Sequence, residues 1–150
     1  MIYKDFQGLK LSQLGFGTMR LPLREDKSID EELAVAMTAE AIAKGVNYFD
    51  TAWPYHSGKS ELVIGEILKQ YPRESFYLAD KFPGHQIAPS YDVKGLFEKQ
   101  LKKCGVEKLT WAFLSSSIVN PDAPKSVLCC CTDMTFVLLC PAIVPFKETE

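Results

Sequence analysis

The feature that most restricts the fold of this 150-residue chain is a strand followed by a helix, repeated three times at nearly constant spacing. Short apolar runs typical of buried strands occupy residues 14–18, 46–50 and 76–79, and a helical pattern follows each of them. The interval from Thr18 to Asp50, and from Asp50 to Lys81, is about 32 residues. Each crossover must return the chain to the same direction, so the repeats predict a parallel sheet.

Capping residues and a glycine predict the limits of the first helix. Ser28 and Glu31 form a capping box, which predicts that the helix begins there, and Gly45 is expected to end it. The face expected to point inward carries apolar residues at four-residue spacing: Leu33, Met37 and Ala41.

The other two helices and an N-terminal hairpin are predicted in the same way. The second helix is expected to open at Ser60 and Glu61, and the third to follow Ser90 and end at Gly105. Their inward residues are expected to be Val63, Ile64, Ile67 and Leu68 in the second helix, and Val93, Phe97, Leu101 and Cys104 in the third. Residues 2–11 alternate loosely between apolar and polar around Gln7 and Gly8, which predicts a two-stranded hairpin.

The nearly equal length of the repeats favours a barrel of (β/α) units, whose catalytic residues collect at the carboxyl ends of the strands. A doubly wound sheet stays open as an alternative, because the same local alternation builds both folds. A complete (β/α)8 barrel needs about 250 residues. We therefore expect an α/β fold that is an incomplete (β/α)8 TIM barrel, made of the N-terminal hairpin and about three to four βα units.

Polar residues stand at or just after the ends of two predicted strands: Asp50, Tyr55 and Lys81. In a parallel sheet these positions meet at one rim, where they suit carbonyl reduction, because a hydride added to a carbonyl leaves an alkoxide that needs a proton. A phenol can donate that proton, a nearby ammonium eases the donation, and a carboxylate keeps the ammonium charged and aimed. Taken singly, each residue also fits a structural role, and only the joint placement favours catalysis.

Several separated motifs, in order along residues 1–107, resemble the aldo-keto reductases. The motifs are residues 14–22, residues 45–52, Tyr55 followed by Ser60-Glu61 and Ile64-Gly65, and residues 78–81. The sequences of these motifs are similar to those of the bacterial branch of the family that often carries an iron–sulfur segment far downstream.

The resemblance implies an NADP(H)-dependent oxidoreductase that transfers hydride between nicotinamide and a small aldehyde, ketone or alcohol, on a barrel closed at the bottom by the N-terminal hairpin. It implies that the catalytic residues are Asp50, Tyr55 and Lys81. It also implies a nicotinamide-binding set, which comprises Gly17, Thr18, Met19 and Asp50. The alternative is a catalytically silent fragment that acts at most as a binding module.

The sequence departs from the family pattern after Glu107. The family's fourth catalytic group is a histidine at the end of the fourth strand, expected near Ser115, and no histidine follows His85. We therefore divide the chain into a partial reductase-like barrel, residues 1–107, and a divergent apolar, cysteine-rich tail, residues 108–150. Residues 109–114 can still pair as a strand. As a truncated barrel, the chain is expected to be inactive.

Three interpretations of the tail stay open. Residues 127–146 are mostly apolar, which is long enough for a membrane anchor, but Asp133, Pro141 and Pro145 argue against a spanning helix. The segment could instead cover the open sheet as a replacement partner. The hypothesis we favour is a reading frame lost near Glu107, which leaves a tail that was never selected to pack.

Charge and cysteine content limit the partners. A net charge of −2 and a pI near 5.7 argue against binding nucleic acid or anionic lipid. Five cysteines, four of them late in the chain (Cys129, Cys130, Cys131 and Cys140), are expected to be free thiols, and His56 and His85 lack partners at metal-ligand spacing. The N-terminus has no leader pattern, so we expect a cytoplasmic location. We also expect a small-molecule carbonyl or alcohol substrate, and self-association through unpaired sheet edges.

Overall fold

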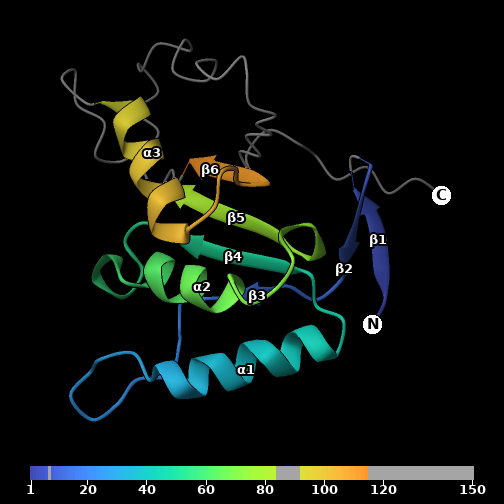
Figure 1. Cartoon of the computed structure of the whole chain (residues 1–150), viewed down its shortest axis with the longest axis horizontal. Helices are drawn as coiled ribbons and strands as arrows, with labels where there is room; N and C mark the ends of the chain where they lie inside the picture. The colour runs from blue at the N-terminus through green and yellow to red at the C-terminus, as the bar shows by residue number, and fades with distance from the viewer. Residues whose placement is uncertain (7, 84–91, 115–150) are drawn as a thin grey trace.

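A computed structural model describes residues 1–6, 8–83 and 92–114, as a hairpin and a parallel sheet packed against helices (Figure 1). The antiparallel hairpin pairs β1 (Tyr3–Phe6) with β2 (Leu9–Ser12). The four-stranded sheet contains β3 (Phe16–Gly17), β4 (Tyr48–Ala52), β5 (Tyr77–Phe82) and β6 (Trp111–Leu114). The helices are α1 (Glu31–Ala43), α2 (Ser60–Leu68) and α3 (Val93–Cys104), with short 3-10 turns η1 (Tyr55–Gly58) and η2 (Arg73–Ser75).

The sheet confirms the predicted parallel arrangement and its incomplete-barrel form. Its strands lie in the order β3-β4-β5-β6, and each neighbouring pair is parallel. A doubly wound sheet reverses its strand order at a switch point. The described strands instead follow their sequence order without reversal, as the first strands of a (β/α)8 barrel do.

The hairpin contacts the amino end of β4, at the edge of the sheet opposite the strand ends that carry the candidate residues (Figure 1). The Tyr3 hydroxyl donates to the Gly45 carbonyl at 2.9 Å, and the Ser12 N–H donates to Asn47 Oδ1 at 2.8 Å. The predicted hairpin is therefore present, although Gln7 in its turn lies outside the described residues.

The start of α1 differs from the capping-box prediction. Asp30 is the N-cap, and its carboxylate accepts the Leu33 N–H at 3.1 Å. Ser28 is occupied elsewhere, because its hydroxyl and its N–H both donate to the Asp26 carboxylate. Ser28 and Asp30 are both residue types that cap helices, and Asp30, directly before the helix, is the N-cap. The predicted C-terminal signal is confirmed, since Gly45 has a φ of 89°.

The inward face of α1 is also rotated from the prediction. Leu33 and Met37 are exposed, at 47% and 42%, whereas Ala34 and Thr38 are buried. Ala34 packs in a buried cluster with Leu21, Ile29 and Ile67, and the Thr38 hydroxyl donates to the Ala34 carbonyl at 2.8 Å. Of the three predicted residues, only Ala41 packs against the core.

The helices α2 and α3 build the main core with β4 and β5. The buried members of this core include Phe49, Leu78, Ile64, Leu68 and Phe97. Most predicted inward residues of the two helices are buried or half-buried there, but Val93 is exposed. The α3 helix is capped by Asp92, whose carboxylate accepts the Gly95 N–H, and it ends at Gly105 with a φ of 63°. Ser90 lies outside the described residues.

The strand allowed at residues 109–114 is present as β6 and pairs with β5. It lies beyond the proposed boundary at Glu107. The four clustered cysteines, the apolar stretch 127–146 and the position near Ser115 lie outside the described residues. Cys104 is a buried free thiol. In the part of the chain that the structure describes, no helix combines the length and hydropathy needed to cross a bilayer.

Candidate active site

The alternation of side chains along β4 and β5 separates a face that packs against helices from the opposite face. Phe49 and Leu78, paired in register, point into the core against α2. Successive strand residues point to opposite faces, so Asp50 and Lys81 project to the other face. Ala52 pairs with Lys81, which places Asp50 one step diagonally from Lys81 on that face.

The structure brings the three predicted rim residues together. The Lys81 ammonium forms an ion pair with Asp50 Oδ1. The same Nζ atom lies 5.3 Å from the centroid of the Tyr55 ring, within the range of a cation–π contact. The Asp50 and Lys81 side chains remain 24% and 29% exposed, so the cluster stays accessible at the rim.

Backbone hydrogen bonds fix the two strand ends that carry this cluster. The Asp50 carbonyl accepts the Thr18 N–H at 2.9 Å and the Thr18 hydroxyl at 3.1 Å. The Lys81 carbonyl accepts the Trp53 N–H at 3.2 Å. The ends of β3, β4 and β5 are therefore joined at the level of the candidate residues.

The predicted cofactor-binding residues occupy two different environments. Gly17 pairs with Asp50 in register, and a Cβ added to Gly17 would meet no atom of the described residues within 4 Å. Met19 is 58% exposed beside it. The Thr18 side chain is fully buried instead, where Ser60 Oγ donates to its hydroxyl at 2.7 Å. Gly17 and Met19 thus border open space at the rim, whereas the Thr18 side chain lies in the interior.

The turn that begins at Tyr55 has an unusual backbone. Its next three residues all have positive φ: His56 at 51°, Ser57 at 57° and Gly58 at 83°. Such left-handed residues cost roughly 1–3 kcal/mol each unless glycine, and they persist where surrounding contacts hold them. One such contact joins His56 Nε2 to the Leu21 N–H, which donates to it at 3.1 Å. Sequence reasoning considered His56 only as a metal ligand and missed this role.

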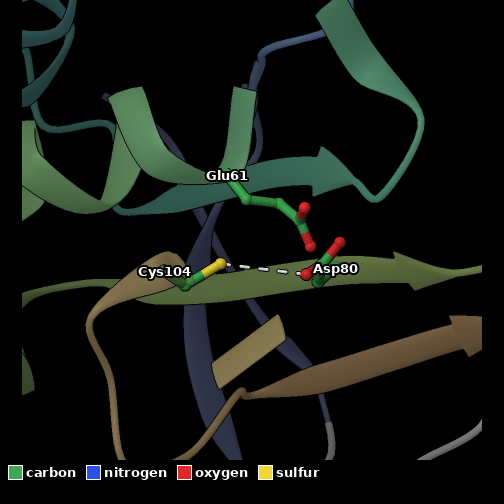
Figure 2. A group of neighbouring side chains, drawn as sticks. All are labelled: Glu61, Asp80 and Cys104. Atoms are coloured by element: carbon green, nitrogen blue, oxygen red, sulfur yellow. Dashed lines mark hydrogen bonds between the residues drawn. The ribbon is translucent and has the colours of Figure 1, made fainter. Parts of the chain in front are cut away.

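A second polar cluster lies on the helix-covered face, directly behind the rim. Figure 2 shows the carboxyl groups of Glu61 and Asp80 pointing toward each other, with the Cys104 thiol beside Asp80. The thiol donates to Asp80 Oδ2 at 3.8 Å. All three side chains are buried, and these residues come from α2, β5 and α3 respectively. Sequence reasoning did not identify this cluster.

Burial changes the proton affinity of two groups in this cluster. Burial, followed by the nearby Glu61 charge, raises the pKa of the Asp80 carboxyl well above its ordinary value of 3.8. Burial, followed by the charge of Asp80, also raises the pKa of the Cys104 thiol. Among the described residues, Glu61 Oε1 and Asp80 Oδ1 have no hydrogen-bond partner. The Lys103 ammonium lies 2.7 Å from Glu61 Oε2 and pairs with that carboxylate.

A family model and known proteins match this chain in sequence. A model described as the aldo/keto reductase family matches residues 13–128, which extends past Glu107 and includes β6. A probable aldo-keto reductase from Glycine max is 36% identical over 110 residues, which cover 67% of this chain and 32% of that protein. L-galactose dehydrogenase from Arabidopsis thaliana is 42% identical over 82 residues, or 49% of this chain and 24% of that protein.

Solved structures resemble the described fold. The holo form of aldo-keto reductase AKR11C1 from Bacillus halodurans matches 76% of this chain and 40% of its own, with a TM-score of 0.62 and 25% identity. An aldo-keto reductase from Klebsiella pneumoniae in complex with NADPH matches 76% and 39%, with a TM-score of 0.62 and 20% identity, a likeness of fold. The chain thus spans about a third or less of the curated relatives and about two fifths of these structures.

Proposed function

The chain belongs to the aldo/keto reductase family, and on that premise we propose that it carries the proton-donating half of an oxidoreductase active site. The reaction proposed is hydride transfer between NADP(H) and a small aldehyde or ketone, or the corresponding alcohol. The chain covers only part of each relative, so the activity of a whole family member is part of this proposal.

The observation that carries the proposal is the convergence of Asp50, Lys81 and Tyr55 on one accessible rim. In the proposed reaction the Tyr55 phenol donates its proton to the substrate oxygen as negative charge develops there. The Lys81 ammonium, close to the Tyr55 ring, stabilises the negative charge left on the phenol. Asp50 holds Lys81 in its charged form and in position.

The residues at the end of β3 are compatible with a nicotinamide cofactor. Gly17 leaves open space where a side chain would stand, and Met19 is exposed beside it. We infer that Gly17, Thr18, Met19 and Asp50 border the nicotinamide, with Thr18 contributing through its backbone because its side chain is buried. When bound, NADPH would supply the hydride. The relative from Klebsiella pneumoniae was solved with NADPH, which supports this choice of cofactor.

The alternative is a silent fragment that acts at most as a binding module. It is favoured by the sequence, which has no histidine after His85 to complete the family's set of four catalytic groups. We propose, as before, a reductase-like part at residues 1–107 and a divergent tail at residues 108–150. We expect turnover by this 150-residue polypeptide to be low or absent, because it lacks that fourth catalytic group.

The experiment that separates the two functions measures NADPH binding by fluorescence and NADPH consumption with a panel of small carbonyl compounds. Saturable binding with carbonyl-dependent consumption supports the reductase. Tyr55→Phe should then lower kcat by a factor of about 100 or more, while binding of NADPH persists. Tyr71→Phe, which removes a phenol hydroxyl next to the core, is the matched control. Absence of saturable NADPH binding favours the silent fragment.

A further inference from the structure

Lys103, near the end of α3, contacts three groups: the Glu61 carboxylate in α2, the Gly58 carbonyl in η1 and the Trp53 ring. Its Nζ atom lies 2.7 Å from Glu61 Oε2 and donates to the Gly58 carbonyl at 3.1 Å. The same atom lies 3.9 Å from the centroid of the Trp53 ring. The ammonium makes all three contacts at once, which holds the side chain in one place.

Two of these contacts lie on either side of Tyr55. Trp53 precedes Tyr55 by two residues, and Gly58 ends the turn η1 that Tyr55 begins. The residues between Tyr55 and Gly58 have left-handed backbone conformations, which the surrounding structure must stabilise. His56 is tied to the Leu21 N–H on one side of the turn, and Lys103 ties Gly58 on the other.

The ammonium of Lys103 is itself fixed by the buried cluster behind the rim. Glu61 is fully buried, and a buried carboxylate requires a paired cation. Asp80, which faces Glu61, is itself a carboxyl group and supplies no positive charge. Glu61 therefore keeps Lys103 oriented, and Lys103 transmits that orientation to the turn.

We propose that Lys103 is a positioning residue that sets the place of Tyr55 relative to Lys81. It acts through the Gly58 carbonyl and the Trp53 ring and does not touch the reacting atoms. Its effect on turnover rests on the proposed function, whereas its effect on the turn does not.

The first arm of the test observes the turn directly, in the 150-residue chain. We compare Lys103→Met with Lys102→Met, which removes an exposed lysine from the same turn of α3. Nuclear magnetic resonance should show a shift of the Gly58 carbonyl carbon and of the His56 and Ser57 amides in Lys103→Met only. In a Trp111→Phe background, Trp53 is the single tryptophan, and its emission should change with Lys103→Met.

A second variant covers the case in which Lys103→Met fails to fold because Glu61 is left buried and unpaired. The double variant Lys103→Met/Glu61→Gln removes both charges and still lacks the donor to Gly58. The same shifts at Gly58, His56 and Ser57 are expected in it. If the folded variant shows shifts no larger than those of Lys102→Met, the proposal is wrong.

The second arm measures turnover. If the wild-type chain consumes NADPH, Lys103→Met should lower kcat about 10- to 100-fold with KM for NADPH unchanged, because Tyr55 is misplaced while the cofactor contacts remain. Lys103→Arg should recover part of the loss. An unchanged kcat overturns the positioning role. A wild-type chain without turnover counts against the proposed function alone, and the first arm still decides the role of Lys103.

Discussion

At the scale of single residues, Asp80 and Lys81 are neighbours in sequence that point to opposite faces of β5. Lys81 lies at the accessible rim as a cation paired with Asp50. Asp80 lies against α2 and α3, where water is excluded and where Glu61 and Cys104 are its neighbours. The same strand therefore carries one charged group at the rim and one buried carboxyl group, with a raised pKa, in the core.

The raised pKa of Asp80 predicts a pH-dependent stability. The folded carboxyl keeps its proton to a higher pH than the unfolded one, so between the two pKa values unfolding releases a proton. The free energy of unfolding should therefore fall as pH rises through that interval. Asp80→Asn, whose amide can donate to Glu61 without titrating, should be more stable than the wild type at neutral pH. The gain should be about 1.4 kcal/mol for each pH unit that separates the two pKa values.

Urea unfolding of both proteins at several pH values between about 4 and 8 tests this prediction. The stability difference between variant and wild type should grow with pH and then level off. Asp5→Asn, which replaces an exposed carboxyl group in β1, controls for the loss of one negative charge. A difference that stays constant with pH would show that Asp80 is ionised in the folded protein.

Residue type and strand position were sufficient to predict that Asp50, Tyr55 and Lys81 lie together, because the ends of parallel strands meet at one rim. The same reasoning could not find Glu61, Lys103 or His56. Their roles depend on which turn of one helix faces which residue of another element, and that register is set by packing. The signal that the sequence offers for the buried cluster is Asp80, a carboxyl group that directly follows the apolar run 76–79.

At the scale of the elements, the local sequence predicted where helices end, but it did not predict which face of α1 is buried. Gly45 and Gly105 end their helices as expected, because each takes a positive φ that other residues avoid. The face of α1 was wrong because Leu33 and Ala34 begin two competing stripes. The stripe that contains Ala34 and Thr38 is the buried one, and sequence periodicity alone does not decide between the two stripes.

The corrected cap of α1 can be tested with two adjacent variants. Asp30→Ala removes the oxygen that accepts the Leu33 N–H and should lower the free energy of unfolding by about 1 kcal/mol. Ser28→Ala loses only an exposed bond to Asp26 and should change it by less than about 0.5 kcal/mol. Urea unfolding followed by circular dichroism measures both. A larger effect for Ser28→Ala would restore the capping box as the start of the helix.

At the scale of the whole molecule, the repeated strand–helix units predicted the parallel sheet, whereas the edges of that sheet raise a different problem. Among the described residues, β3 pairs only with β4, and β6 pairs only with β5. A closed barrel leaves no such edges. Exposed apolar residues on this part of the chain add to the unfavourable surface, including Leu14 at 63% and Leu33 at 47%.

We therefore predict that the chain associates with itself through these edges. An unpaired edge offers N–H and C=O groups that a second chain can satisfy, so the associated fraction should rise with protein concentration. Size-exclusion chromatography with light scattering should give masses above the 16.8 kDa of one chain, falling toward that value on dilution. A mass of 16.8 kDa at every concentration would mean that the edges are already satisfied within one chain, and the incomplete barrel would then be a self-sufficient monomer.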